Sequence, residues 1–370
     1  MLVPGRWLIA MLLALTGCGS VVSNRHLDAG SSDFDFRHPG CPQMPAAVDA
    51  AEVRYLGSGG AAVTWRGDTI LLGPYFSRPG GVLQAQFGSL QFDLARIEAG
   101  MSLVDAAKVR AILVGHSHFD HFGDVPILLD RYVPQARVFT NIDGAYMLAA
   151  YPEHQSSIQV IDKIEGEWVG VGAAMRIKPV RWDHAPQVCR WRDGWPCTYA
   201  KCRVGEEWTQ KWDTRKLKHL CGGSTYAYLI DLLEPGGGIA LRLFYNDAAA
   251  GGHHAKHVGE NIDHGRPVDV AIVSVPSYHL VTGYPEELLR AVAPRHVVLT
   301  HYEDFFVRSR DRWRFVPLLT NSRADHFIRT VVQETGSLDN VPLRPVAETC
   351  GPSTARWSIP APGWPLYFRP

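Results

Sequence analysis

Three histidines and an aspartate fall within six residues, and this cluster constrains the chain more than any other feature. The residues are His116, His118, Asp120 and His121. The apolar run 111–114 before them predicts a buried strand, and Asp124 with Pro126 after them predicts a helix start. The four side chains are therefore expected on a turn at the carboxyl end of a strand. A lone surface histidine is usually only solvated, but this density after a buried strand indicates a metal site.

The spacing within the cluster predicts two ions rather than one. Residues two apart in an extended segment point the same way, so His116 and His118 can share an ion. Asp120 and His121 then face a second ion. Imidazole nitrogens and a carboxylate suit zinc, although iron and manganese accept the same ligands. The expected cofactors are therefore two divalent metal ions, with zinc preferred.

Around the motif, short strands alternate with helices, which indicates an α/β fold. The first part of the chain predicts strands at 53–56, 61–65, 69–72, 111–114 and 137–140, and helices at 103–107, from 124 and at 145–151. The second part predicts strands at 224–232, 239–245, 268–273 and 296–299, and helices at 285–292 and 323–334. Residues 346–370 are expected to form an irregular, proline-rich tail.

The N-terminus predicts export. Arg6 precedes the apolar run 7–15, which is shorter than the ~20 residues that a membrane span needs. The following Leu-Thr-Gly-Cys at 15–18 resembles the bacterial lipobox, in which the peptide is cleaved before an acylated cysteine. The resemblance implies a signal peptide at 1–17 and a lipidated Cys18 with a tether to residue 46. Ordinary signal cleavage is the alternative, and both place the chain in the cell envelope or outside the cell.

Export also changes how the cysteines are interpreted, because an oxidising compartment favours disulfides. A segment over about 186–221 is rich in cysteine and tryptophan and predicts a disulfide-stabilised insertion. It could be a lid, a lipid-contact surface or a simple loop, and a lid is favoured because it follows His184. The cysteines other than Cys18 are Cys41, Cys189, Cys197, Cys202, Cys221 and Cys350. Cys41 and Cys350 are expected to clasp the termini together.

The charge balance excludes one class of partner. Lys plus Arg and Asp plus Glu are equal at 37 each, so the formal net charge is zero. Proteins that bind nucleic acid usually carry a basic excess. We therefore expect a small-molecule or lipid substrate and no nucleic acid, with membrane contact through acylated Cys18.

The cluster at 116–121 matches the His-x-His-x-Asp-His motif, and nearly the whole mature chain resembles the metallo-β-lactamase superfamily. The later ligands of that family have counterparts in the same order at His184, Asp247 and His301, each at the end of an expected strand. The resemblance implies a four-layer αββα fold with a catalytic domain at 47–345. It also implies one ion held by His116, His118 and His184, and a second held by Asp120, His121 and His301, with Asp247 shared.

In this family the resemblance implies that a hydroxide bridging the two ions is the nucleophile, oriented by Asp120. Residues 55–60 and 73–78 resemble the branch that contains ascorbate-phosphate lactonases and N-acyl-phosphatidylethanolamine-hydrolysing phospholipase D. This chain has Gly73 where that branch has aspartate, and alanines at 248 and 249 where it has a small Thr/Ser-Gly pair. The expected substrate is a phosphodiester or a lactone-type ester.

Four further histidines are candidates for the site. His279 follows an expected strand and could protonate a leaving group or bind a phosphate. His253, His254 and His257 follow Asp247 and could line the site, although a solvated helix start fits them better. Two other functions stay open: hydrolysis of β-lactams, and a non-catalytic lipoprotein binding module on the same scaffold.

Overall fold

The computed structural model describes residues 50–80, 91–185, 222–263, 265–303, 305, 324–335, 357–360 and 362–370. The predicted signal peptide, tether and cysteine-rich insertion lie outside these residues, as do all seven cysteines. Within these ranges, no helix has both the length and the apolar character needed to cross a membrane.

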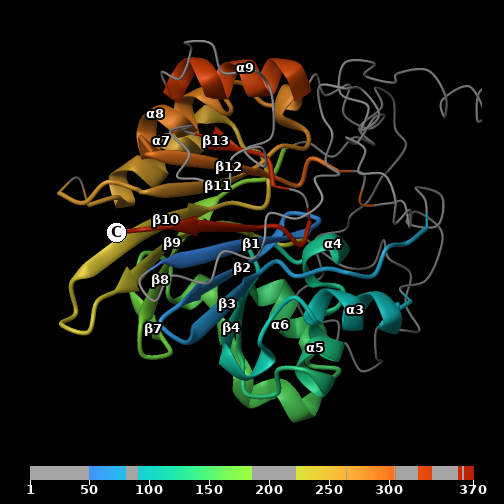
Figure 1. Ribbon diagram of the computed structural model, residues 1–370. Coiled ribbons are helices and arrows are strands. Elements are labelled where there is room, and N and C mark those ends of the chain that lie inside the picture. The colour runs from blue at the N-terminus through green and yellow to red at the C-terminus, as the bar shows by residue number, and fades with distance from the viewer. Residues whose placement is uncertain are drawn as a thin grey trace, which may run out of the picture.

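Two seven-stranded sheets form the centre of the fold (Figure 1). The first has the order β14-β1-β2-β3-β4-β5-β6, and the second has the order β13-β12-β11-β10-β9-β8-β7. The strands of the first are β1 Ala51–Gly57, β2 Gly60–Trp65, β3 Asp68–Leu72, β4 Val109–Leu113, β5 Arg137–Thr140, β6 Ile158–Val160 and β14 Pro365–Phe368. Those of the second are β7 Val169–Val171, β8 Met175–Trp182, β9 Thr225–Leu233, β10 Ile239–Tyr245, β11 Val270–Ser274, β12 His296–Thr300 and β13 Trp357–Ser358.

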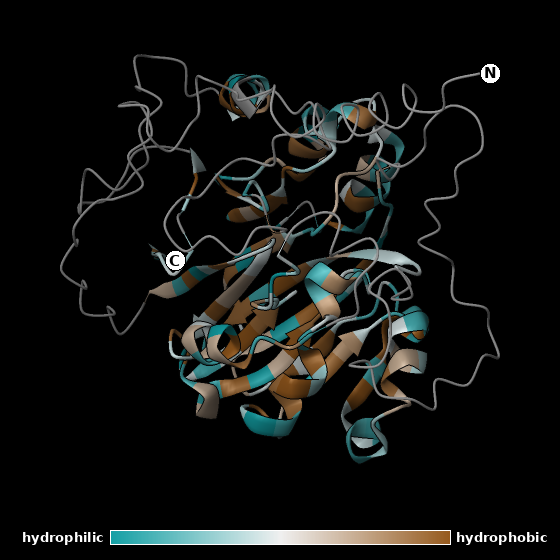
Figure 2. Cartoon of the chain, turned by 90° about the vertical axis from the view of Figure 1, so that its right-hand side faces the viewer, coloured by the Kyte–Doolittle hydropathy of each residue, from teal (hydrophilic) through white to brown (hydrophobic). Residues whose placement is uncertain are grey.

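Helices cover the outer face of each sheet. The first sheet carries α3 Leu94–Met101, α4 Phe119–Phe122, α5 Val125–Arg131 and α6 Ile142–Leu148, and the second carries α7 Gly252–Asn261, α8 Glu286–Val292 and α9 Ala324–Thr335. Three buried apolar clusters separate the four layers, one between the sheets and one beneath each set of helices. Figure 2 shows this apolar character along the strands. The predicted four-layer αββα arrangement is confirmed.

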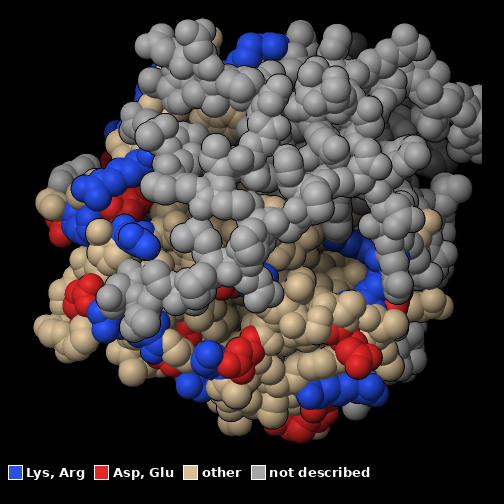
Figure 3. All heavy atoms as spheres, viewed as in Figure 1, with Lys and Arg blue, Asp and Glu red and all other residues tan. Residues whose placement is uncertain are grey.

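The surface agrees with the balanced composition. On the face shown in Figure 3, acidic and basic side chains are intermixed over the described residues.

The helix expected at 103–107 is wrong in position. The structure has α3 at Leu94–Met101 instead, and only a short 3-10 turn at Ala106–Lys108. The side chain of Asp93 caps α3 by accepting a hydrogen bond from Arg96 N at 3.2 Å. Gly100 lowers the helix propensity of this segment, but a Cβ there would lie 2.1 Å from the Phe76 ring. Close packing against Phe76 therefore requires glycine at position 100, although glycine disfavours a helix in sequence-based prediction.

The prediction of an irregular tail at 346–370 is wrong at Trp357–Ser358 and Pro365–Phe368, which form β13 and β14. β13 pairs in parallel with β12, and β14 pairs antiparallel with β1, with Ala51 opposite Phe368. Pro365 is the first residue of an edge strand, where a missing N–H costs no ladder hydrogen bond. These strands depend on partners far away in the sequence, so local patterns do not reveal them.

Candidate metal centre

The loop after β4 supplies four of the seven predicted ligands. His118 is the N-cap of α4 in extended backbone, with φ −63° and ψ 155°. Asp120 and His121 lie on the single turn of α4, so the chain changes direction between the two pairs of ligands. His116, His118, Asp120 and His121 are all buried. The expected turn at a strand end is therefore a short helical turn.

The other three ligands lie at the ends of alternate strands of the second sheet. His184 follows β8, Asp247 follows β10 and His301 follows β12. β8 and β10 are both antiparallel to β9, and β10, β11 and β12 are parallel, so the carboxyl ends of β8, β10 and β12 share one edge. This topology brings residues distant in the sequence to the same place as the loop after β4.

The structure brings all seven predicted ligands together in three overlapping groups. Within each group the possible ligand atoms lie within 4.8 Å of one another. The groups are His116 with His118 and His184, His116 with His121 and Asp247, and Asp120 with His121 and His301. The first and third groups are the two predicted ligand triads, and the group with Asp247 combines one histidine from each.

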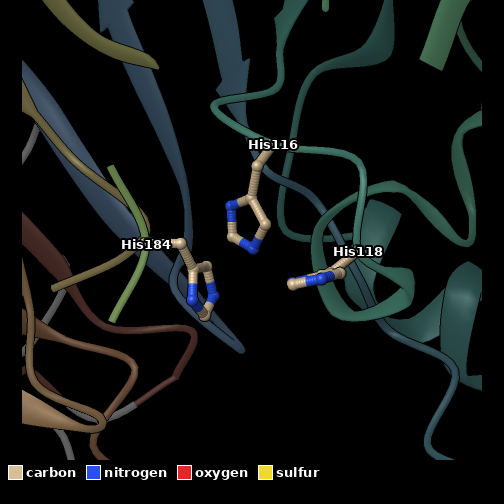
Figure 4. A group of neighbouring side chains, drawn as sticks. All are labelled: His116, His118 and His184. Carbon is tan, nitrogen blue, oxygen red and sulfur yellow. The ribbon is translucent and has the colours of Figure 1, made fainter. Parts of the chain in front are cut away.

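The first group consists of three imidazole rings that face one another (Figure 4). The ring centroids of His116 and His118 are 4.5 Å apart, and that of His184 lies 4.7 Å from His116 and 4.9 Å from His118. Imidazole is a common ligand for zinc and related ions, and three of them around one point form a typical site.

The group of Asp120, His121 and His301 combines imidazoles with a carboxylate. Asp120 Oδ2 lies 3.3 Å from His301 Nε2 and 3.6 Å from His121 Nε2. Asp247 lies between the groups, with Oδ1 3.0 Å from His116 Nδ1. Its Oδ2 accepts a hydrogen bond from Gly115 N at 3.0 Å, which fixes the carboxylate in place.

Several polar atoms of the cluster are buried without a hydrogen-bond partner among the described residues. These are both ring nitrogens of His121 and Nδ1 of His301. A buried polar atom without a partner costs about 1–3 kcal/mol, so the arrangement is unfavourable unless something binds there. A divalent ion with nitrogen and oxygen ligands would satisfy these atoms, and the residues therefore fit the predicted metal ions.

Burial also sets the protonation of the ligands. It lowers the pKa of His116 and His118 well below the usual value, and it lowers the pKa of His121 to about 3. Burial by itself would raise the pKa of Asp120, but His121 and His301 hold that pKa below its ordinary value. At neutral pH His116, His118 and His121 are therefore neutral and Asp120 is ionised, the forms that bind metal.

Gly115 is a residue whose role the sequence did not reveal. A Cβ at this position would lie 2.4 Å from Asp247 Oδ1, so any side chain would displace the carboxylate. Gly59, with φ +77°, has a similar role, because a Cβ there would lie 3.1 Å from the rings of both His121 and His301. The backbone approaches the ligands closely at both positions, which only glycine allows.

A buried network behind His301 was also missed from the sequence. His301 has φ 58°, a conformation that costs a non-glycine residue about 1–3 kcal/mol. Its N–H donates to Tyr55 Oη at 2.9 Å, and the Tyr55 hydroxyl donates to the Glu303 carboxylate. Glu303 also accepts from Ser58 N and pairs with Arg78 at 3.5 Å. The network holds the His301 backbone in place. Tyr55 and Glu303 are far apart in the sequence, so no local pattern predicts their contact.

Asp124 marks the start of α5 as expected, but its side chain acts elsewhere. Its Oδ2 accepts hydrogen bonds from Phe76 N at 2.7 Å and Ser77 N at 2.8 Å, while Oδ1 is buried without a hydrogen-bond partner among the described residues. Burial raises the pKa of Asp124 to about 6, although the Ser77 and Phe76 N–H groups oppose the shift. The carboxyl ties the segment after β3 to the helix after the metal loop.

This raised pKa predicts a pH-dependent stability. Because the folded pKa exceeds the value of ~3.9 for an unfolded aspartate, the contribution of Asp124 is present below about pH 4 and is lost as the pH rises through about 6. Relative to Asp124→Asn, the wild type should lose up to about 3 kcal/mol of unfolding free energy between pH 4 and pH 8. Urea unfolding of both proteins across this range measures the difference. Parallel pH profiles would contradict the assignment.

The remaining candidate histidines are not brought into the centre. His279 lies on the short 3-10 turn Tyr278–Leu280, and its side chain is exposed. Among the described residues it joins none of the groups that could hold a metal ion. His253, His254 and His257 lie on α7, as a helix start predicts. The catalytic role of His279 stays a prediction.

Comparison with known proteins supports the same class of protein as the fold and the site. The model of the metallo-beta-lactamase superfamily matches residues 95–194, which include five of the seven candidate ligands. The chain is 33% identical over 127 residues to a UPF0173 metal-dependent hydrolase of Anaeromyxobacter dehalogenans strain 2CP-1, covering 34% of this chain and 40% of the relative. A UPF0173 metal-dependent hydrolase of Anaeromyxobacter sp. strain K is 32% identical over the same length. The chain thus spans about 40% of the length of the curated relatives it matches.

Solved structures resemble the chain more distantly. Igni18, a metallo hydrolase from the archaeon Ignicoccus hospitalis, is 17% identical with a TM-score of 0.48, covering 86% of this chain and 99% of that chain. A possible metal-dependent hydrolase from Veillonella parvula is 12% identical, also with a TM-score of 0.48 and with the same coverage. The family match and the curated relatives support a metal-dependent hydrolase of the metallo-β-lactamase superfamily.

Proposed function

We propose that this protein is a hydrolase that works with two divalent metal ions held by the seven buried or half-buried side chains. The observation that carries the proposal is the overlap of the three ligand groups, which share His116 and His121. Two ion sites built from shared neighbours are typical of hydrolytic centres. Ligand atoms without hydrogen-bond partners at His121 and His301 support occupancy by metal.

The chemistry follows from what each component can supply. When bound, the two ions provide a water of lowered pKa and polarise the bond to be broken. Asp120 is ionised and faces His301, so its carboxylate can bind a metal ion and orient a water. Asp247 is held by Gly115 N and His116, which keeps it between the two groups. Burial of the cluster excludes bulk water and strengthens these interactions.

The proposed substrate class is a phosphodiester or a lactone-type ester. Support for it comes from the resemblance of residues 55–60 and 73–78 to one branch of the superfamily. Hydrolysis of β-lactams is the second candidate, because the same ligand set would serve it. A panel with a chromogenic phosphodiester, a lactone and nitrocefin, each assayed at equal concentrations, separates these possibilities.

Metal content tests the proposal as a whole. Plasma mass spectrometry of protein purified without chelator, and again after zinc reconstitution, should give about two ions per chain that depend on the ligands of the centre. Replacement of His121, which belongs to two of the ligand groups, should lower this number. A chain that retains no metal in either preparation would instead support the non-catalytic binding module.

His279 is the remaining candidate for a proton donor. If it protonates the leaving group, His279→Ala should lower kcat by about 10²-fold or more while the metal content stays unchanged. The rate should recover with a substrate whose leaving group needs no proton, such as p-nitrophenolate. Unchanged kinetics with a poor leaving group would remove His279 from the mechanism.

We place the proposed activity in the bacterial cell envelope, facing the periplasm or the exterior. This location is supported by the lipobox-like residues 15–18 and the apolar run before them. The full-length protein expressed in a bacterial host should incorporate labelled palmitate and partition with membranes. Cys18→Ala should lose the label and become extractable, and a variant that stays membrane-bound would contradict lipid anchoring.

A further inference from the structure

A separate cluster of metal-ligating side chains lies beside the centre, at Asp183, His253 and His254. Their possible ligand atoms lie within 4.8 Å of one another. Asp183 directly precedes the candidate ligand His184, and the two histidines lie in the first turn of α7. Asp183 is exposed and His254 is partly buried, so the cluster faces solvent while resting on the protein.

The cluster already brings its possible ligand atoms near one point. His254 Nε2 lies 3.1 Å from Asp183 Oδ2, and the rings of His253 and His254 have centroids 3.8 Å apart. The other carboxylate oxygen of Asp183 accepts the His184 N–H at 2.8 Å, which orients the side chain. The 3.1 Å between His254 Nε2 and Asp183 Oδ2 is close to the separation of two atoms bound to one zinc ion at ~2.0–2.2 Å.

Hydrogen bonds elsewhere hold the two segments of the cluster together. Ala185 N donates to Ala249 O at 2.6 Å, and Trp182 Nε1 donates to Ala248 O at 2.7 Å. The His254 ring also packs edge-on against Trp182, with centroids 6.2 Å apart. The three ligands are therefore positioned by the fold, which lowers the entropic cost of binding.

We propose that Asp183, His253 and His254 form a third, solvent-facing metal site for a zinc-like transition-metal ion. Two imidazoles and one carboxylate suit zinc, nickel or copper far better than magnesium or calcium, and water completes the coordination. An ion at this site ties the segment that carries His184 to the start of α7. The proposal does not depend on hydrolytic activity.

A second surface cluster lacks these properties and provides a comparison. Asp130, Glu153 and His154 also bring ligand atoms together, but they include only one imidazole. His154 Nε2 is bonded to Asp130 Oδ1 at 2.7 Å. Carboxylate-rich sites with one histidine bind zinc less selectively, so this cluster is expected to contribute no ion of comparable affinity.

Zinc binding to the full chain tests the proposal. Equilibrium dialysis against a series of free Zn²⁺ concentrations, followed by plasma mass spectrometry, gives the number of ions per chain and their affinities. The informative variants are His253→Ala, and His254→Gln, which keeps a hydrogen-bond donor for Asp183 but is a poor zinc ligand. Each should lose one ion, or bind it at least about tenfold more weakly.

Two controls separate the third site from other histidines. His257 lies on the same helix, and its exposed imidazole pairs with Glu165 and Glu260. The His257→Ala variant should leave zinc binding unchanged. His154→Gln should leave it unchanged as well. Equal loss of zinc in the His257 variant and the His253 variant would mean nonspecific binding and would overturn the proposal. Full zinc binding by both His253→Ala and His254→Gln would also overturn it.

The test also distinguishes failure here from failure of the proposed hydrolase. His121→Ala should lose zinc from the buried centre and keep the ion that depends on His253. If the buried centre bound no zinc at all, the comparison of His253→Ala with wild type would still report on the third site. Zinc-dependent shifts of the His253 and His254 ring resonances in the wild type provide a second, direct readout.

Discussion

Asp120→Ala is expected to abolish turnover and leave the fold intact. Asp120 is buried, belongs to the group with His121 and His301, and has an ionised carboxylate that contacts His301 at 3.3 Å. The variant loses a ligand and the group that orients the attacking water, so kcat/KM should fall by at least about 10³-fold. Steady-state assays with the substrate found in the panel measure the effect.

Two measurements make this prediction specific. Circular dichroism and the unfolding free energy should stay close to wild type, because removal of a carboxylate from a buried site relieves a desolvation cost. Asp130→Ala, which removes a surface aspartate paired with His154, serves as the control and should keep full activity. Substantial turnover by Asp120→Ala would reject the proposed role of this carboxylate.

Tyr55→Phe is expected to weaken the second metal position without touching any ligand. The variant leaves the buried His301 N–H without its acceptor and removes the donor to Glu303, at a cost of about 1–3 kcal/mol. His301 can then relax from its φ of 58° and move its ring. Loss of a group that orients a ligand typically weakens metal binding by about 10–100-fold.

The matched control for this change is Tyr302→Phe. Tyr302 is also buried next to Tyr55, but its hydroxyl donates to Pro360 O at 2.8 Å. Both variants lose a buried hydrogen bond, so both should lower the unfolding free energy by a similar amount. Only Tyr55→Phe should weaken the more labile ion in a chelator competition assay. Equal metal affinity in the two variants would show that the Tyr55 network serves stability alone.

Much of the candidate centre follows from the sequence by itself. His116, His118, Asp120 and His121 form a dense local motif, and the resemblance to the superfamily implies His184, Asp247 and His301 from their order at the ends of expected strands. The alternation of strands and helices also sufficed for the α/β fold and for most strand positions. These features are local, since a few neighbouring residues encode both the element and the chemistry.

Only the tertiary structure decided the features that depend on distant partners. β13 and β14 exist because β12 and β1 offer free edges, and Gly115 must be glycine because Asp247 lies against it. Glu303, Tyr55 and the strained backbone of His301 form one buried unit from opposite ends of the chain. The physical reason is common to all of them. Burial and hydrogen bonding are determined by which residues are close in space. The spacing of residues along the chain does not predict which distant residues come into contact.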